Sequence, residues 1–313
     1  MRNAFLNSLT TLAKNDDRLF FITGDLGFGV FEDFEKNHPN QFLNVGVAEQ
    51  NMASIAAGMA LEGRKVFIYS IGNFPTLRCL EQIRNDICYH NADVKIIGMG
   101  GGFSYGQLGM SHHTTEDISI LRALPNMTVV VPGTEREVVG AMDSFKDLTS
   151  PAYLRLDKSK AEDLPSIESF ELGKCRQISD GNALTIITAG GILSEVVLAE
   201  ARLRKKGISC RILSMHTIKP LDVDAIKKAI QETDGILTVE ENNYLGGLGG
   251  AVSEYCLESD VRPKLFRRLG IQDVYPSIVG DQSYLRAHYG LDNLAIEKTV
   301  LEMLHTDRNE KTG

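Results

Sequence analysis

The segment 42–63, "FLNVGVAEQNMASIAAGMALEG", places one carboxylate, Glu49, at the head of a run of small and apolar residues. Residues 42–47 predict a short buried strand. Residues 51–61 predict a tightly packed helix, because small residues at helical spacing let another backbone come close. An acid at such a junction can simply complement the helix dipole, which is worth about 0.3–1 kcal/mol. It can equally be a functional carboxylate at the carboxyl end of a strand, where open α/β sheets bind ligands.

A second candidate is the aromatic side chain of Phe74, in the stretch 69–86, "YSIGNFPTLRCLEQIRND". The strand pattern ends at Tyr69, a Gly/Asn/Pro turn follows, and a helix comes next. Phe74 can be an ordinary core residue, or it can offer a flat face on which a heteroaromatic ring stacks. Arg78 and Gln82 share one face of the helix through their i, i+4 spacing.

Two adjacent histidines, His112 and His113, lie near the end of the glycine-rich stretch 98–117, "GMGGGFSYGQLGMSHHTTED". Glycines let a backbone approach a ligand closely, and loops at strand ends often carry function. Neighbouring histidines diverge and no third ligand is spaced nearby, which disfavours a zinc site. One of them can act in proton transfer or oxyanion stabilisation, since imidazole titrates near neutrality. Two solvated loop histidines are the alternative.

Two further glycine-rich stretches could suggest phosphate binding, residues 23–29 ("TGDLGFG") and 240–254 ("EENNYLGGLGGAVSE"). Neither has the G-x-G-x-x-G spacing of a dinucleotide loop, and Asp25 in the first would repel a phosphate. We therefore interpret both as tight strand-to-helix turns.

The elements that must position these side chains alternate along the chain. Strand-like runs are expected at residues 18–25, 42–47, 65–70, 94–100, 127–133, 152–156, 183–190, 209–215 and 235–241. Helical period and charge patterning are found at residues 51–63, 77–91, 135–148 and 192–207. Such alternation specifies βαβ units. Because the polar segment 157–182 interrupts it, we expect two α/β domains, each a mostly parallel sheet flanked by helices: residues 1–165, a linker at 166–182, and residues 183–313.

Composition narrows the classes of function. A net charge of −8 over 313 residues argues against nucleic acid or an anionic membrane as the main partner. No segment has the length and apolarity of a membrane span, and the first 18 residues lack the apolar core of a signal peptide, so we expect a cytoplasmic protein. The five scattered cysteines form no C-x-x-C pair, which indicates reduced, mostly buried thiols.

Taken together, these motifs resemble the transketolase superfamily of thiamine diphosphate enzymes. "NVGVAEQNM" is similar to the glutamate motif of its pyrimidine-binding domain, and "NFPTLRCLEQIRN" to its aromatic-plus-"R..DQ" helix. "SHHTTEDISILRALPNMTVVVP" is similar to its "THQ…ED…LR.lPNM" segment. The chain from residue 181 to 222, and again from 239 to 254, resembles the family's C-terminal domain. The order of these motifs extends the resemblance over nearly the whole chain.

The resemblance implies a cofactor site. Glu49 would hydrogen-bond a ring nitrogen of the aminopyrimidine and favour its imino tautomer, which removes the thiazolium proton. Phe74 would stack on the pyrimidine ring. Asp25 and Leu26 would lie beside the cofactor, and Arg78 would also contribute to its site.

It also implies a substrate site. His112, aligned with the histidine of "THQ", would face the substrate and stabilise charge on its oxygen. His113, Gln107 and Lys158 complete the expected substrate-binding set, with Lys158 near the position of a phosphate-binding arginine. Counting back from His112, Gly100 stands where transketolases usually carry a histidine, and Leu108 where they usually carry an aspartate. His113 replaces the glutamine of "THQ". These departures predict a substrate other than an ordinary pentose phosphate.

The family's first domain, which holds Mg²⁺ and the diphosphate through a G-D-G…N segment, has no counterpart in the sequence. We therefore expect the C-terminal subunit of a split transketolase-like enzyme, with no metal ligands of its own, in an α2β2 assembly with an N-terminal subunit. It would transfer a two-carbon ketol unit between sugar-type substrates. The alternatives are the beta subunit of a decarboxylating relative (a 2-oxo acid dehydrogenase or a deoxyxylulose-phosphate-synthase-like enzyme) and a non-catalytic partner of an intact transketolase.

Overall fold

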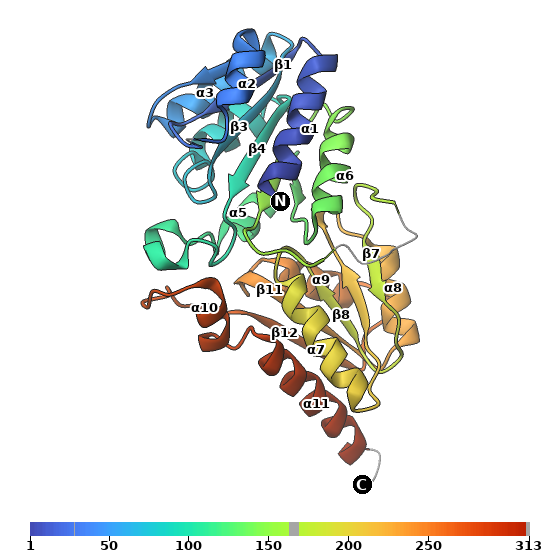
Figure 1. Cartoon of the computed structure of the whole chain (residues 1–313). Helices are drawn as coiled ribbons and strands as arrows, with labels where there is room; N and C mark the ends of the chain where they lie inside the picture. Colours follow the sequence, from blue (N-terminus) through green and yellow to red (C-terminus); the bar gives the residue numbers. More distant parts are fainter. Residues whose placement is uncertain (28, 163–168, 311–313) are drawn as a thin grey trace.

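The computed structural model describes residues 1–27, 29–162 and 169–310, with side chains described up to His305 in the last helix. Figure 1 shows two α/β units joined end to end, each with its own sheet. The expected fold class, two domains with mostly parallel sheets flanked by helices, is confirmed.

The first sheet has the strand order β10-β5-β6-β4-β3-β1-β2. All its strands are parallel except β10, which runs antiparallel to β5. The central strands are almost wholly buried runs of apolar residues, as is typical of a parallel sheet covered on both faces. The strands are β1 (Leu19–Thr23), β2 (Phe42–Asn44), β3 (Lys65–Ile71), β4 (Val94–Met99), β5 (Thr128–Val130), β6 (Ala152–Leu156) and β10 (Thr217–Lys219).

Helices cover both faces of this sheet. Because successive strand residues point to opposite sides, Phe21 and Phe67 pack with α1 and α6, whereas Ile22 and Ile68 pack with α3. The helices are α1 (Arg2–Asn15), α2 (Glu32–Asn37), α3 (Glu49–Leu61), α4 (Leu80–Gln82), α5 (Asp117–Arg122) and α6 (Glu135–Phe145). Short turns of other types are η1 (Pro39–Gln41), η2 (Ile83–Cys88), η3 (Gly106–Leu108) and η4 (Met110–His112).

The second sheet has the order β12-β11-β8-β9-β7, in which β7 is antiparallel to β9 and the other pairs are parallel. Its strands are β7 (Arg176–Ser179), β8 (Thr185–Thr188), β9 (Arg211–Ser214), β11 (Gly235–Asn243) and β12 (Leu265–Ile271). Its helices are α7 (Leu193–Lys205), α8 (Val223–Glu232), α9 (Leu248–Glu258), α10 (Gln282–His288) and α11 (Asn293–Glu310), and the buried face of α11 packs with α7.

Two elements differ from the sequence-based expectation. The expected linker, residues 166–182, contains β7, which pairs with the second sheet through Arg176 and Gln177; its first three residues, 166–168, lie outside the described residues. In addition, β10 leaves the second unit and pairs with β5 of the first sheet. The chain therefore crosses between the units three times, after β6, after β9 and after β10, so a single cut does not separate the two sheets.

The helix expected at 77–91 is not a regular α-helix. Its α-helical part is the short α4, which continues directly into the π-helical turn η2. A π-helical turn inside a helix often accompanies a functional site. In the described ranges, no helix is both long and apolar enough to cross a membrane, and the five cysteines are free thiols, four of them buried.

Candidate functional site

Glu49 is the first residue of α3 and is 3 % exposed. The chain reaches it through β2 and a turn at Gly46, so its carboxylate lies near the carboxyl end of the first sheet. Its Oε2 lies 3.4 Å from Nη1 of Arg78, whose own side chain is 52 % exposed. The acid is thus buried while its one ion-pair partner among the described residues reaches solvent.

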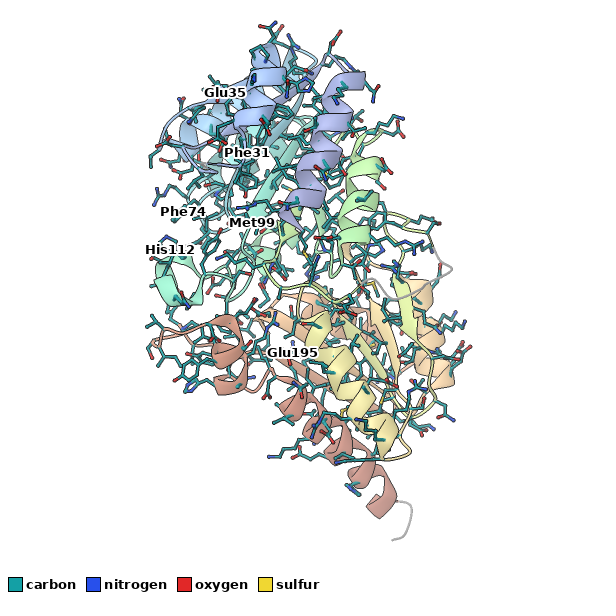
Figure 2. All side chains as sticks on the ribbon, in the orientation of Figure 1. Phe31, Glu35, Phe74, Met99, His112 and Glu195 are labelled. Atoms are coloured by element: carbon teal, nitrogen blue, oxygen red, sulfur yellow. The ribbon has the colours of Figure 1, made fainter. Side chains whose placement is uncertain are left out.

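Phe74 and His112 lie next to each other, although they come from different loops (Figure 2). Their rings meet edge to face with centroids 5.3 Å apart. The two loops are tied by a hydrogen bond in which Nδ2 of Asn73 donates to the carbonyl oxygen of Ser111 at 3.0 Å. The Arg78 guanidinium carbon lies 5.2 Å from the Phe74 ring centroid, so Arg78 links Phe74 to Glu49.

His112 is half-buried and has one ring nitrogen in a hydrogen bond. Its Nδ1 lies 3.0 Å from Oγ of Ser111. Within the described part of the chain, Nε2 has no such partner, so it remains available to a bound molecule. The structure thus brings together Glu49, Arg78, Phe74 and His112 from the expected set.

Asp25 and Leu26 lie in the turn after β1. Asp25 has a positive φ of 58°, and its N–H donates to Oδ1 of Asn44 at 2.9 Å, while Nδ2 of Asn44 donates to the Asp25 carboxylate at 3.2 Å. The carbonyl oxygen of Leu26 accepts from Oγ1 of Thr23 at 3.2 Å. The turn is therefore held by side chains from β1 and β2, the strands on either side of it in sequence.

His113 has a different environment from His112. It is 2 % exposed, its Nε2 lies 3.4 Å from the Gly106 carbonyl oxygen, and its ring meets that of Phe103 edge to face at 5.3 Å. Burial lowers the pKa of the His113 imidazole. The His113 ring is thus buried in this structure, whereas the expectation that His113 binds substrate requires an exposed ring. Gln107, by contrast, lies exposed on η3.

Lys158 lies over the ring of Tyr105, with Nζ 3.7 Å from the ring centroid. Burial and then the charge of Arg2 lower the pKa of the Lys158 ammonium. The charge of Arg2 also acts to lower the pKa of Tyr105, against a larger upward effect of burial. Neither cation has an acidic partner among the described residues. Arg2 gave no signal in the sequence, because one arginine in a terminal helix is unremarkable until the fold lets its charge act on Lys158.

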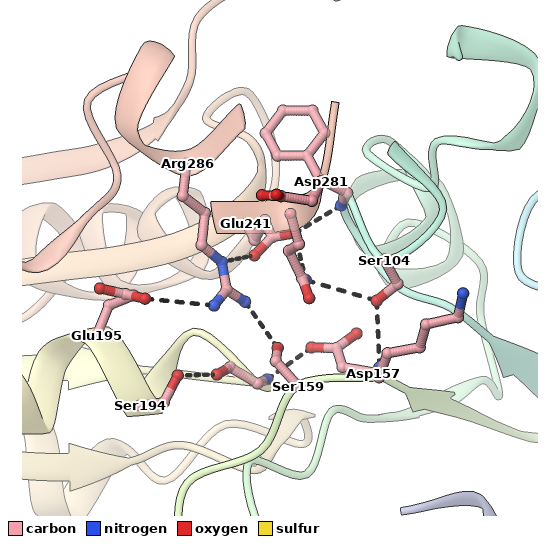
Figure 3. A network of polar contacts seen from close by, with 12 residues as sticks. Ser104, Asp157, Ser159, Ser194, Glu195, Glu241, Asp281 and Arg286 are labelled. Carbon is pink, nitrogen blue, oxygen red and sulfur yellow. Dashed lines mark hydrogen bonds and ion pairs between the residues drawn. The ribbon is translucent and has the colours of Figure 1, made fainter. Parts of the chain in front are cut away.

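The glycine-rich loop between β4 and η3 is anchored by the second unit. Glu241 of β11 accepts a hydrogen bond from the Phe103 N–H at 2.5 Å, and its other carboxylate oxygen pairs with Nε of Arg286 (Figure 3). Gln282 donates to the same carboxylate at 2.9 Å. A Cβ added to Gly102 would lie 2.4 Å from Glu241 Oε1, so the loop can approach the carboxylate only because residue 102 lacks a side chain.

A second buried group sits beneath this loop. Arg155 pairs with Asp117 at 3.3 Å and with Asp157 at 3.4 Å, and its Nη2 donates to the carbonyl oxygen of Glu241 at 2.7 Å. Arg155 is 2 % exposed, so it has a structural role and does not present its charge to a ligand. Sequence reasoning missed Glu241 and Arg286, because the hydrogen bond from the Phe103 N–H to Glu241 joins residues of different units.

The residues present fit one half of a thiamine diphosphate molecule. A buried carboxylate beside a half-exposed aromatic ring matches an aminopyrimidine, which offers ring nitrogens and a flat face. No group of three or more metal-ligating side chains is found in residues 1–27, 29–162 and 169–310.

Two family models match the chain. The transketolase pyrimidine-binding domain matches residues 1–162, and the transketolase C-terminal domain matches residues 173–296. The chain belongs to the transketolase family. Both matches agree in order with the two units of the fold, and the family implies thiamine diphosphate as cofactor.

Several relatives match the chain from end to end. One subunit of the apulose-4-phosphate transketolase from Phocaeicola vulgatus is 40% identical over 307 residues, 97% of each chain. The 6-deoxy-6-sulfo-D-fructose transketolase subunit from a Clostridium species is 32% identical, covering 97% of this chain and 94% of its own. The 1-deoxy-D-xylulose-5-phosphate synthase of Syntrophus aciditrophicus is 31% identical over 98% of this chain, which corresponds to 47% of its own length.

A solved structure described as a split gene transketolase, an inactive beta4 tetramer, superposes with a TM-score of 0.86 at 30% identity, covering 97% of both chains. The transketolase family and the type of enzyme subunit expected from the sequence, the C-terminal part of a split transketolase-like transferase, are therefore confirmed.

Proposed function

We propose that this chain supplies the pyrimidine-binding and substrate-facing half of a transketolase active site. The observation that carries the proposal is the cluster of Glu49, Arg78, Phe74 and His112 at one edge of the first sheet. A non-catalytic partner of an intact transketolase has no need of this cluster, which disfavours that alternative.

Glu49 would hold the aminopyrimidine ring by a hydrogen bond from its buried carboxylate, and Phe74 would stack against the ring. When bound, thiamine diphosphate supplies the carbon nucleophile that breaks and forms carbon–carbon bonds. The Glu49 carboxylate lies at the N-terminus of α3, and its Oε2 lies 3.4 Å from Nη1 of Arg78. Asp25 and Leu26, held by Asn44 and Thr23, would border the same ring.

His112 would face the substrate. Because Ser111 engages its Nδ1, Nε2 is the nitrogen able to donate to a substrate oxygen as negative charge develops there. The contact with Phe74 places the imidazole beside the ring that would stack on the cofactor. Gln107, exposed on the same loop, is a second candidate contact to substrate, whereas His113 would have to leave its buried position to join it.

Lys158 and Arg2 would bind an anionic end of the substrate. Burial, and then the charge of Arg2, lower the pKa of the Lys158 ammonium, and neither cation has an acidic partner among the described residues, so a bound anion would meet uncompensated positive charge. The two named relatives act on apulose 4-phosphate and on 6-deoxy-6-sulfo-D-fructose, which carry a phosphate and a sulfonate. We propose a ketol donor or acceptor of this kind, distinct from an ordinary pentose phosphate.

The diphosphate and Mg²⁺ would be held by an N-terminal subunit on a separate polypeptide, in an α2β2 assembly in the cytoplasm. One observation supports this arrangement: the relatives that match from end to end are themselves single subunits of a transketolase. The active site would form where the two subunits meet.

The test is reconstitution with the polypeptide encoded beside this chain, in the presence of thiamine diphosphate and Mg²⁺. Ketol transfer is followed by mass spectrometry of the sugar products, and release of CO₂ from pyruvate is followed in parallel. Two-carbon transfer without CO₂ supports the proposal, while CO₂ release would favour the decarboxylating alternative. Efficient turnover of xylulose 5-phosphate with ribose 5-phosphate would contradict the non-standard substrate.

A further inference from the structure

The ring of Tyr105 occupies the space directly above Gly100. Gly100 has a positive φ of 92°, and a Cβ built on it would lie 2.1 Å from Cε2 and 2.3 Å from Cδ2 of Tyr105. No side chain at position 100 can coexist with the ring in this place. Tyr105 therefore fills the space that a side chain at position 100 would need.

The ammonium of Lys158 lies over the same Tyr105 ring. Nζ lies 3.7 Å from the ring centroid, well within the range of a cation–π contact. The backbone N–H of Lys158 donates to Oγ of Ser104 at 3.2 Å, so both ends of this flexible side chain are held by consecutive loop residues. The position of the charge is therefore set by the loop rather than by an acidic partner.

Tyr105 is not buried as an ordinary core residue is. It is half-buried, and its hydroxyl has no hydrogen-bond partner in the described part of the chain. Arg2 is close enough to influence the ionisation of both Tyr105 and Lys158. One face of the aromatic ring is thus occupied by an ammonium, where a packing role alone would place apolar neighbours.

We propose that Tyr105 is a specificity-determining residue of the substrate pocket. Its ring fixes the Lys158 ammonium to receive the anionic end of a sugar, a phosphate or a sulfonate, and it closes the space above Gly100 to other substrate groups. This inference rests on the proposed function, because it assigns the substrate end of the same site.

The first experiment measures ketol transfer by the reconstituted assembly from hydroxypyruvate to glyceraldehyde 3-phosphate and to glyceraldehyde, which differ only in the phosphate. Tyr105→Leu is expected to raise KM for the phosphorylated aldehyde about 5-fold with little change in kcat, and to leave glyceraldehyde unaffected. Tyr105→Phe, which keeps the ring, is expected to behave like the wild type. In a Lys158→Met background, Tyr105→Leu is expected to have no further effect. Equal effects on both aldehydes would overturn the inference.

The second experiment does not depend on turnover. Trace acetylation of the assembly with acetic anhydride, read by peptide mass spectrometry, reports the reactivity of the Lys158 amine relative to Lys36 on α2. Phosphate and methanesulfonate are tested separately. Each is expected to slow acetylation of Lys158 in the wild type and in Tyr105→Phe, but not in Tyr105→Leu. The anion that slows acetylation more, phosphate or methanesulfonate, indicates whether the substrate carries a phosphate or a sulfonate. Protection by neither anion would overturn the inference. Protection without ketol transfer would instead contradict the proposed function alone.

Discussion

The rings of Phe74 and His112 meet edge to face, 5.3 Å between centroids, at the point where two loops of the first domain converge. Phe74 follows β3 and His112 ends the loop that follows β4, and these two strands are neighbours in the sheet. Because parallel strands end at the same edge, adjacent strands deliver their loops to one place. The aromatic face and the imidazole therefore form one site, with Glu49 joined to it through Arg78.

Replacing Glu49 by glutamine is expected to lower kcat of the reconstituted enzyme at least about 100-fold, because the side chain keeps its shape but loses its charge and basicity. Assembly with the partner should be unchanged. The matched control is Glu62→Gln, an exposed carboxylate at the other end of α3, which should retain wild-type kcat. Full activity of the Glu49 variant would show that this chain's acid takes no part in the reaction.

Replacing His112 by alanine is expected to lower kcat/KM by about 100-fold, because the transition state loses a donor to its developing oxyanion. His90→Ala serves as the comparison, since His90 is exposed and contacts only Tyr89 among aromatic neighbours in the described chain. Steady-state kinetics of both variants measure the change in kcat/KM. A loss confined to stability, with normal kinetics in the folded fraction, would argue against a role in transfer.

Gly102→Ala is expected to lower the free energy of unfolding by about 3 kcal/mol. About 1 kcal/mol comes from the left-handed backbone, φ +57°, and the rest from displacing Glu241. Gly207→Ala isolates the first contribution, because Gly207 has φ +76° and open space around its missing Cβ. Urea unfolding of the two variants measures the difference. Equal losses would mean that the contact with Glu241 does not constrain the loop.

His216 is expected to make the protein less stable in acid. Burial, and then the charge of Arg176, lower the pKa of its imidazole to about 3. The unfolded chain takes up this proton near pH 6.5, so below that pH the unfolded state binds more protons and the free energy of unfolding falls, by up to about 1.4 kcal/mol per pH unit. Unfolding measured between pH 7 and 4 should show a shallower fall for His216→Leu. Parallel curves for the two proteins would contradict this assignment.

Most of the first sheet could be predicted from the sequence, because its strands are continuous apolar runs such as Lys65–Ile71, bounded by turn residues. The strand β10 could not. It is three residues long, has no measurable periodicity, and finds its partner β5 in the other unit. For the same reason β7 was expected to be part of a linker, since its antiparallel pairing with β9 depends on contacts far along the chain.

The residues of the candidate site also fall into those that could be predicted from the sequence and those that could not. Glu49, Phe74 and His112 could be selected because each follows a predicted strand, and their convergence follows from the parallel sheet. Tyr105 and Arg2 could not, because nothing local distinguishes them before folding brings Lys158 over the Tyr105 ring and lets the Arg2 charge act on it. The adjacent histidines looked equivalent in sequence, yet the direction of the backbone buries His113 against Phe103 and leaves His112 beside Phe74.

The most direct test of a divided active site is calorimetric titration of thiamine diphosphate and Mg²⁺ into this chain alone, and into its mixture with the partner polypeptide. We expect heat of binding in the mixture only, lost again when Glu49→Gln replaces the wild type. Equal binding by the chain alone would show that it holds a complete cofactor site and would contradict the account.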